Sequence, residues 1–267
     1  MYHFSSRFSP YLTSYDFLKF FAVVTMLIDH VGFFFFPDQP WLRAIGRLSF
    51  PCWMFLVGFA NTRAVPKMLV GGCLALVGVN FVLGQYILPL NILALIILMR
   101  LVLTPLAQVV FKSKEGLFYA FLLILILGLP LVSYVEYSTF GILMVLFGFA
   151  VRHRGETCLG FWSERIFSAG VVLVCVVGQV VPFHLLNWMG VGYGLAMVGL
   201  GVVLFHFSAQ EFIEFTQKFP KPAVWILQFC GRYSLEIYVV HVIVFYLAAI
   251  YLGIKDLRWF DPDLFYR

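Results

Sequence analysis

The sequence contains very little charge for its length. Asp, Glu, Lys and Arg make up 12% of the 267 residues, whereas 62% are hydrophobic and the mean hydropathy is +0.96. Because a soluble domain has about 25% charged residues, this much apolar surface cannot be buried in one water-exposed globule. The composition excludes a disulfide-rich secreted scaffold, a nucleic-acid-binding domain and a disordered chain, and it indicates an all-α, polytopic transmembrane helical bundle.

Other common features are also missing. The five cysteines contain no CxxC pair and no metal-ligand spacing, so we expect packing thiols and no bound metal. The chain has no internal repeat, which gives no support to an inverted-repeat transporter. No small-residue cleavage site follows the first apolar run, so we expect that run to remain as the first membrane span. A single integral membrane domain then accounts for residues 1–267.

Apolar runs separated by charge clusters or by Pro and Gly predict about nine membrane spans, or ten. A span needs about 20 largely apolar residues to cross the hydrocarbon core. We expect Pro51 to kink the second span, the sixth to be short, and residues 222–229 to lie at the interface before the last span. The predicted spans are 17–36, 46–62, 66–84, 88–110, 117–135, 138–151, 165–183, 187–207 and 233–252.

Basic residues predict the orientation of these spans. Lys and Arg are more numerous in the segments on the side of the N-terminus, among them Arg63, Lys67, Arg152 and Arg154, than in those on the opposite side. Because cytoplasmic loops carry the excess of Lys and Arg, we expect a cytoplasmic N-terminus in a bacterial inner membrane. The net charge of +5 then points to membrane lipids or an anionic cosubstrate as partners, and not to nucleic acid.

The first predicted span carries polar residues that are costly in lipid. Lys19 and His30 are 11 residues apart, which places them on nearly one helix face and about 16 Å apart along the axis. A neutral imidazole in a low-dielectric cavity is able to accept a proton from an amine or a hydroxyl group. Asp29 lies about 100° round the helix, so it either orients His30 or pairs with Arg47 or Arg100. The simpler interpretation is that Lys19 snorkels and that Asp29 and His30 bond neighbouring helices.

Other spans carry further candidates. Arg47 is expected at the outer membrane boundary, where the simpler interpretation is a topological charge at the interface. Arg100 lies near mid-membrane in the fourth span, where a partner or a bound anion is needed to explain it. Asn91 and Arg100 fall on opposite helix faces. His241 lies in the last span, where a hydrogen-bonded packing histidine is the simpler interpretation.

Five ordered segments resemble those of the TraX family, within the acyltransferase-3-like membrane acyltransferases. Lys19, ten intervening residues and then His30 is similar to the Arg/Lys-x10-His signature of the superfamily's first helix. The order and spacing of the segments match TraX across residues 15–247. The segments are LKFFAVVTMLIDHVG, GRLSFP, LPLNILALIIL, YSTFGILMVLFGF and EIYVVHVIVF. The charged tail KDLRWFDPDLFYR departs from this resemblance, because it does not align with the family.

The resemblance implies transfer of an acetyl group from cytoplasmic acetyl-CoA to a protein, glycan or lipid acceptor, pilin being the acceptor for which TraX is named. His30 is then the catalytic base or transient acyl carrier, with Asp29 beside it. We assign the cosubstrate to Lys19, Arg47 and Arg100, and the acceptor to Asn91 and His241. Arg63, Lys67, Arg152 and Arg154 are further candidates for CoA phosphate contacts, although the positive-inside rule explains them equally well.

Two other functions fit the same residues. A proton-coupled transporter would use Asp29, His30, Arg100 and His241 as a relay, and it would move substrate or protons without acyl-CoA. A membrane assembly subunit would use the polar residues only to hold helices together, so that substitutions there would lower stability without switching off an activity.

Overall fold

The computed structural model describes residues 9–131, 133–180 and 188–265, and 73% of the chain is helical. No strand is present in these ranges, where only isolated bridges join loops. The prediction of an all-α chain is therefore confirmed. The helices are α1 (Ser14–Phe35), α2 (Pro40–Gly46), α3 (Ser49–Phe59), α4 (Lys67–Val82), α5 (Ile92–Val110), α6 (Lys114–Leu131), α7 (Ser138–Arg152), α8 (Phe161–Val180), α9 (Trp188–Phe205), α10 (Ile213–Lys218), α11 (Lys221–Arg232) and α12 (Ser234–Tyr251).

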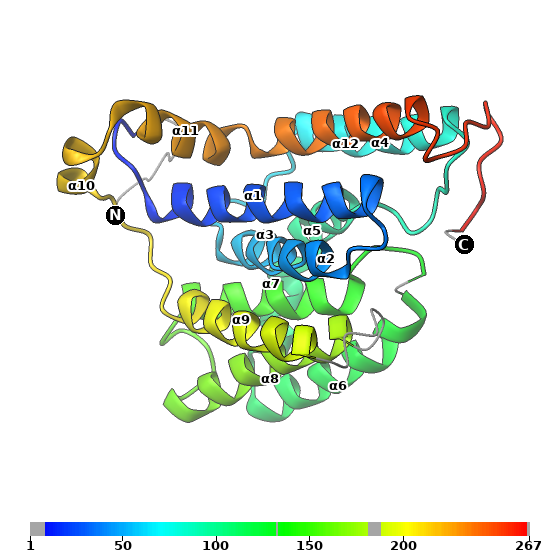
Figure 1. Cartoon of the computed structure of the whole chain (residues 1–267). Helices are drawn as coiled ribbons and strands as arrows, with labels where there is room; N and C mark the ends of the chain where they lie inside the picture. Colours follow the sequence, from blue (N-terminus) through cyan, green and yellow to red (C-terminus); the bar gives the residue numbers. More distant parts are fainter. Residues whose placement is uncertain (1–8, 132, 181–187, 266–267) are drawn as a thin grey trace.

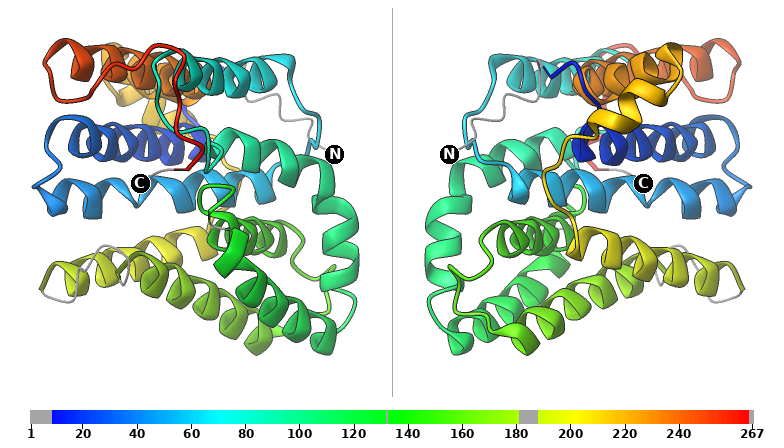
Figure 2. Two further views of the ribbon diagram at one scale, coloured as in Figure 1. Left: turned by 90° about the vertical axis from the view of Figure 1, so that its right-hand side faces the viewer. Right: turned by 90° about the vertical axis from the view of Figure 1, so that its left-hand side faces the viewer.

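The long helices form three layers. α1, α2 and α3 lie in the middle, between α4, α11 and α12 on one side and α6 to α9 on the other (Figure 1). The same stacking is visible from both ends of the bundle (Figure 2). α1 therefore contacts α11 and α12 on one face and α2 and α3 on the other. This central position explains why its polar residues meet partners from distant parts of the chain.

Capping residues fix where two helices of the site begin. Thr13 is the N-cap of α1, and its backbone N–H donates to Asp16 Oδ2 at 2.9 Å in a capping box. Asn91 is the N-cap of α5, where its Oδ1 accepts a hydrogen bond from the Leu93 N–H at 3.1 Å. Because the first N–H groups of a helix have no partner within the helix, these side chains complete the first turns.

The second predicted span differs from the structure at its start. The chain forms a short α2 and then α3, with the break at residues 47 and 48, before Pro51. Pro51 lies in the first turn of α3, where a residue needs no backbone N–H for the helix. The expected kink at Pro51 is therefore wrong. With the chain broken at this point, Arg43 in α2 and Arg47 at the break both face Asp29 of α1.

Glycines allow close approaches between packed helices. A Cβ on Gly46 would lie 2.3 Å from the Asp29 Cα, so α2 meets the backbone of α1 there. At the crossing of α3 and α7, a Cβ on Gly58 would lie 1.9 Å from the Val145 carbonyl oxygen, and one on Gly148 would lie 2.1 Å from the Phe55 carbonyl oxygen. Small residues at helix crossings are typical of helix packing in membranes.

The second predicted span overlaps α2 and α3, and each of the others overlaps one helix. Within the described residues, six helical segments are long and apolar enough to cross a membrane, with α2 and α3 counted as one. These six are Ser14–Phe35, Pro40–Phe59, Ile92–Val110, Phe161–Val180, Trp188–Phe205 and Ser234–Tyr251. α4 and the described part of α7 are shorter apolar helices. The ends of the seventh and eighth predicted spans, at 181–183 and 187, lie outside the described residues. The count of nine and the cytoplasmic N-terminus stay predictions.

Candidate functional site

A cavity of about 1330 Å³ lies at the end of the bundle where α1, α4, α6, α8 and α12 finish, which we call the cavity end. Its wall is mostly apolar, with a few polar side chains. Four of the predicted site residues line it: Asp29, His30, Arg47 and Asn91. A concave, largely apolar space with few polar groups is typical of a small-molecule site.

His30 and His241 are directly hydrogen-bonded. His30 Nδ1 and His241 Nε2 are 2.5 Å apart, the ring centroids are 4.8 Å apart, and the ring planes differ by 22°. The nitrogen of one ring therefore lies in a position to accept the N–H of the other. His241 is buried, whereas His30 lines the cavity. The structure thus gives His241, which we expected at the acceptor, a direct contact with the predicted catalytic residue.

The surroundings of His241 determine which nitrogen of His30 is available. His241 Nδ1 lies 2.6 Å from the Ile237 carbonyl oxygen, which only accepts hydrogen bonds, so Nδ1 carries a proton. In a neutral His241 the Nε2 atom is then an acceptor, and His30 Nδ1 must donate to it. His30 Nε2 is left with its lone pair, and no described residue is hydrogen-bonded to it. A base with a fixed tautomer therefore faces the cavity.

Asp29 does not orient His30 but pairs with Arg43 in α2 and with Arg47 directly after α2. Asp29 Oδ2 is 3.1 Å from Arg43 Nη1, and Asp29 Oδ1 is 3.5 Å from Arg47 Nε. The side chains are 7% exposed for Asp29 and 16% and 15% exposed for the arginines. The expected pairing with Arg47 is found and the alternative pairing with Arg100 is not. Arg43 was missed, although its position four residues before Arg47 places both on one helix face.

The connection between α6 and α7 adds two further residues to the cavity wall. The Tyr137 hydroxyl accepts a hydrogen bond from Arg47 Nη1, and its ring stacks on Phe50 with the ring centroids 4.3 Å apart. Burial raises the pKa of the Glu136 carboxyl to about 7, while the charge of Arg47 lowers it less. Neither residue was predicted, because the sequence shows only an acid and an aromatic between two apolar runs.

Asn91 lines the cavity, but both polar atoms of its side chain form hydrogen bonds with backbone groups. Besides capping α5 through Oδ1, its Nδ2 donates to the Cys73 carbonyl oxygen at 3.4 Å. Its amide therefore holds the start of α5 against α4.

Lys19 lies near the opposite end of α1 from His30. Its Nζ donates to the Gly231 carbonyl oxygen at 3.0 Å, at the junction of α11 and α12. Since His30 meets His241 ten residues beyond Gly231, the two contacts fix the register of α1 against α11 and α12. Lys19 is thus placed to align the histidines, and it does not line the cavity.

Arg100 also lies outside the cavity. Its Nη1 donates to the Ala64 carbonyl oxygen at 2.7 Å, in the connection between α3 and α4. A charged side chain in lipid needs a polar partner, and for Arg100 this partner is the backbone carbonyl of Ala64. Lys19, Arg47 and Arg100, which we assigned together to the cosubstrate, do not converge on one place.

Arg63, Arg152, Arg154 and Arg165 gather at the end where α1 starts, which we call the basic end. Arg63 donates to the Val57 and Gly58 carbonyl oxygens, at 2.9 and 3.3 Å, where α3 ends. The Arg152 guanidinium lies 5.2 Å from the Phe59 ring centroid.

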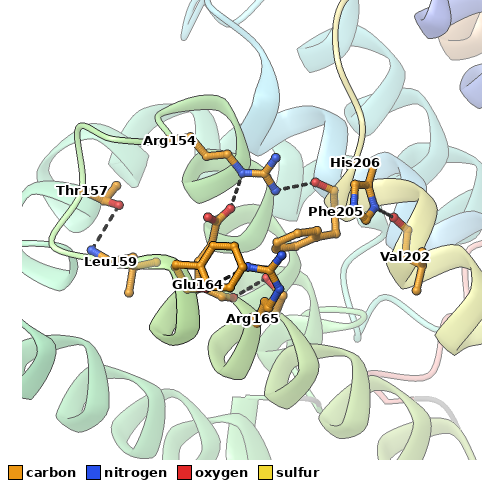
Figure 3. A network of polar contacts seen from close by, with 10 residues as sticks. Arg154, Thr157, Leu159, Glu164, Arg165, Val202, Phe205 and His206 are labelled. Atoms are coloured by element: carbon orange, nitrogen blue, oxygen red, sulfur yellow. Dashed lines mark hydrogen bonds and ion pairs between the residues drawn. The ribbon is translucent and has the colours of Figure 1, made fainter.

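Arg154 is neutralised at the basic end. It pairs with Glu164 and donates to the Phe205 carbonyl oxygen at 2.5 Å, as Figure 3 shows. Arg154 therefore has its own carboxylate, that of Glu164. In the described ranges, no group of three or more His, Cys, Asp or Glu side chains is placed to hold a metal ion.

The layered apolar helices, several of them long enough to span a membrane, are consistent with a multi-pass membrane protein. The family described as TraX protein matches residues 14–249, so the chain belongs to the TraX family. The chain is also 24% identical over 238 residues to the uncharacterized protein RP591 of Rickettsia prowazekii (strain Madrid E), covering 88% of this chain and 92% of that protein. No solved structure gives a significant match.

Proposed function

We propose that this protein is an integral membrane acetyltransferase, of the acyltransferase-3-like type, that moves an acetyl group from acetyl-CoA to an amine or hydroxyl of an acceptor. The observation that carries the proposal is the His30–His241 pair, which leaves a basic nitrogen of His30 facing a large cavity. Membership of the TraX family supports the same activity.

In the proposed reaction, His30 Nε2 takes the proton of the acceptor's amine or hydroxyl group while the acceptor attacks the thioester carbonyl carbon. The C=O electrons move to oxygen, and the positive charge of Arg43 and Arg47 stabilises this oxyanion. When the carbonyl re-forms, the C–S bond breaks and the CoA thiolate takes the proton from His30. The products are the acetylated acceptor and free CoA.

The donor and the acceptor would reach this site from different ends. Arg63 and Arg152 at the basic end suit the phosphates of CoA, because guanidinium groups bind phosphate strongly. The cavity end holds the acceptor: a pilin, a glycan or a lipid. Since a thioester is already activated, a base, positioning and oxyanion stabilisation are sufficient chemistry.

The test is turnover of radiolabelled acetyl-CoA by the purified, detergent-solubilised protein and its His30→Gln variant. We expect the variant to lose at least about 100-fold in rate, as expected for loss of a general base. His206→Gln is the matched control, because it removes an exposed histidine just after the end of α9. His206 Nδ1 contacts the carbonyl oxygen four residues earlier, that of Val202, in the same way that His241 Nδ1 contacts that of Ile237.

Each outcome of that experiment decides one point. A folded His30→Gln variant that turns over at the parent rate would contradict the proposal. Turnover with a hydroxylamine-sensitive label on the wild-type protein, absent from His30→Gln, would identify His30 as an acyl carrier instead of a base. Proton flux in vesicles without any dependence on acyl-CoA would favour the transporter.

A further inference from the structure

The segment that follows α12 contributes two residues, Ile254 and Lys255, to the cavity wall. We call residues 252–265 the strap; they lie beyond the residues that match the TraX family. Backbone hydrogen bonds hold the strap against the connection between α4 and α5: Phe260 N–H to the Val82 carbonyl at 3.2 Å, and Leu88 N–H to the Leu264 carbonyl at 2.8 Å. The Arg258 guanidinium donates to the Gly84 carbonyl oxygen at 3.0 Å.

A helix-ending motif sets the position of Lys255 within the strap. Gly253 has a φ of 68°, the left-handed conformation that glycine adopts without strain. The Ile254 N–H bonds the Ala249 carbonyl oxygen at 2.9 Å, and the Gly253 N–H bonds that of Ile250 at 3.0 Å. These are the two bonds of a Schellman motif, so the chain reverses at once and returns Lys255 across the end of α12.

The Lys255 ammonium lies against aromatic rings in the cavity wall. Its Nζ is 4.5 Å from the Phe33 ring centroid and 5.4 Å from those of Phe34 and Tyr246. Phe34 is also in edge contact with His30, at 6.2 Å between ring centroids. The Phe34 ring therefore lies in contact with both Lys255 and His30, the proposed catalytic base.

The charge of Lys255 is balanced differently from that of the other cavity cations. Arg43 and Arg47 share Asp29. No carboxylate of the described residues lies within 4 Å of Lys255 Nζ, so ring faces are its protein contacts. Burial lowers the pKa of Lys255, since its positive charge is partly removed from water. An anionic group of a ligand would replace the lost hydration.

We propose that Lys255 is a specificity-determining residue that binds an oxyanion, of the phosphate class, carried by the molecule that occupies the cavity. The inference rests on the proposed function only in treating that molecule as the acetyl acceptor. A phosphate near the aromatic cluster of Phe33, Phe34 and Tyr246 leaves the acceptor's nucleophile on the side of His30. The phosphate belongs either to a soluble molecule or to a lipid headgroup.

The test is equilibrium binding of radiolabelled glycerol 3-phosphate to the full chain in phosphatidylcholine nanodiscs. We expect Lys255→Met to weaken binding about tenfold, because it removes a charge-assisted hydrogen bond. Lys255→Arg should stay within about threefold of the parent, since it keeps the charge. Lys112→Met is the matched control, because it removes the same charge from an exposed position at the end of α5.

Two results would overturn the proposal: unchanged binding in Lys255→Met, or an equal loss of glycerol 3-phosphate and glycerol, which would indicate a damaged cavity. Replacing phosphatidylcholine with phosphatidylglycerol in the nanodiscs distinguishes a lipid headgroup from a soluble phosphate as the ligand. If a headgroup occupies the site, the ratio of wild-type to Lys255→Met affinity falls in those discs, and if the ligand is soluble the ratio is unchanged. Lys255-dependent binding without acetyl-CoA turnover would reject the acetyltransferase and keep the anion site.

Discussion

The two ends of the bundle use the same kind of residue in different ways. At the cavity end, Arg43 and Arg47 are largely buried and share the carboxylate of Asp29. At the basic end, Arg154 is 40% exposed beside Glu164, and Arg63 bonds the last carbonyl groups of α3. Buried charges depend on their partner, whereas exposed ones also interact with water. A charge change should therefore matter far more at the cavity end.

The largest effect is expected where the backbones meet. Gly46→Ala places a methyl group 2.3 Å from the Asp29 Cα, so α2 must separate from α1 and the arginines must leave Asp29. We expect destabilisation of about 3 kcal/mol or more, seen as loss of monodisperse protein in detergent and a lower melting temperature. Gly71→Ala is the control, because a Cβ on Gly71 meets no atom within 4 Å. Equal melting of the two variants would show that the α1–α2 contact is not a tight one.

The next effect compares one carboxylate from each end. Asp29→Asn removes the carboxylate that Arg43 and Arg47 share and should cost about 3–5 kcal/mol. Glu164→Gln breaks the more exposed pair with Arg154 and should cost about 1 kcal/mol or less. Chemical denaturation in mixed micelles measures both. Similar losses for the two variants would remove the distinction between the ends.

A third comparison separates the positioning of His30 from general stability. His241→Phe removes the acceptor that holds the His30 N–H, and we expect kcat to fall about 10- to 100-fold with KM changed less than threefold. His206→Phe, at the basic end, should keep the parent kcat. The substitution should also change how the rate depends on pH, because His30 becomes free to adopt either tautomer. A loss confined to KM would instead return His241 to the acceptor role expected from sequence.

The smallest effect concerns Glu136. Its folded-state pKa of about 7 lies above the ordinary 4.5, because burial disfavours the charged form. Its contribution to stability is therefore fully present below about pH 4.5 and is lost as the pH rises through about 7. Glu136→Gln should make the stability less dependent on pH. At pH 8 the melting temperature of the variant should exceed that of the parent, by about 2–4 °C for each kcal/mol gained in the free energy of unfolding. Near pH 4 the two proteins should melt at the same temperature. Parallel pH curves for the parent and the variant would contradict it.

Local sequence signals predicted most of the helices and some of the site. Apolar runs located every long helix, and the i, i+4 spacing of Arg43 and Arg47 is a local signal that both arginines lie on one helix face. His30 stood out because an imidazole in lipid needs a reason. Arg100 was misleading for the same reason, since the carbonyl oxygen of Ala64 in a distant loop serves it.

The sequence by itself determined an all-helical, apolar chain, the start of α1 at its capping box and the turn at Gly253, because each depends on residues within one or two helical turns. Only the tertiary structure decided that His30 meets His241, 211 positions away, that Asp29 serves the arginines and that Lys19 aligns α1. These contacts depend on which helix faces pack together and at what register. Packing in lipid is set by close approach at small residues such as Gly46, and no local pattern encodes it.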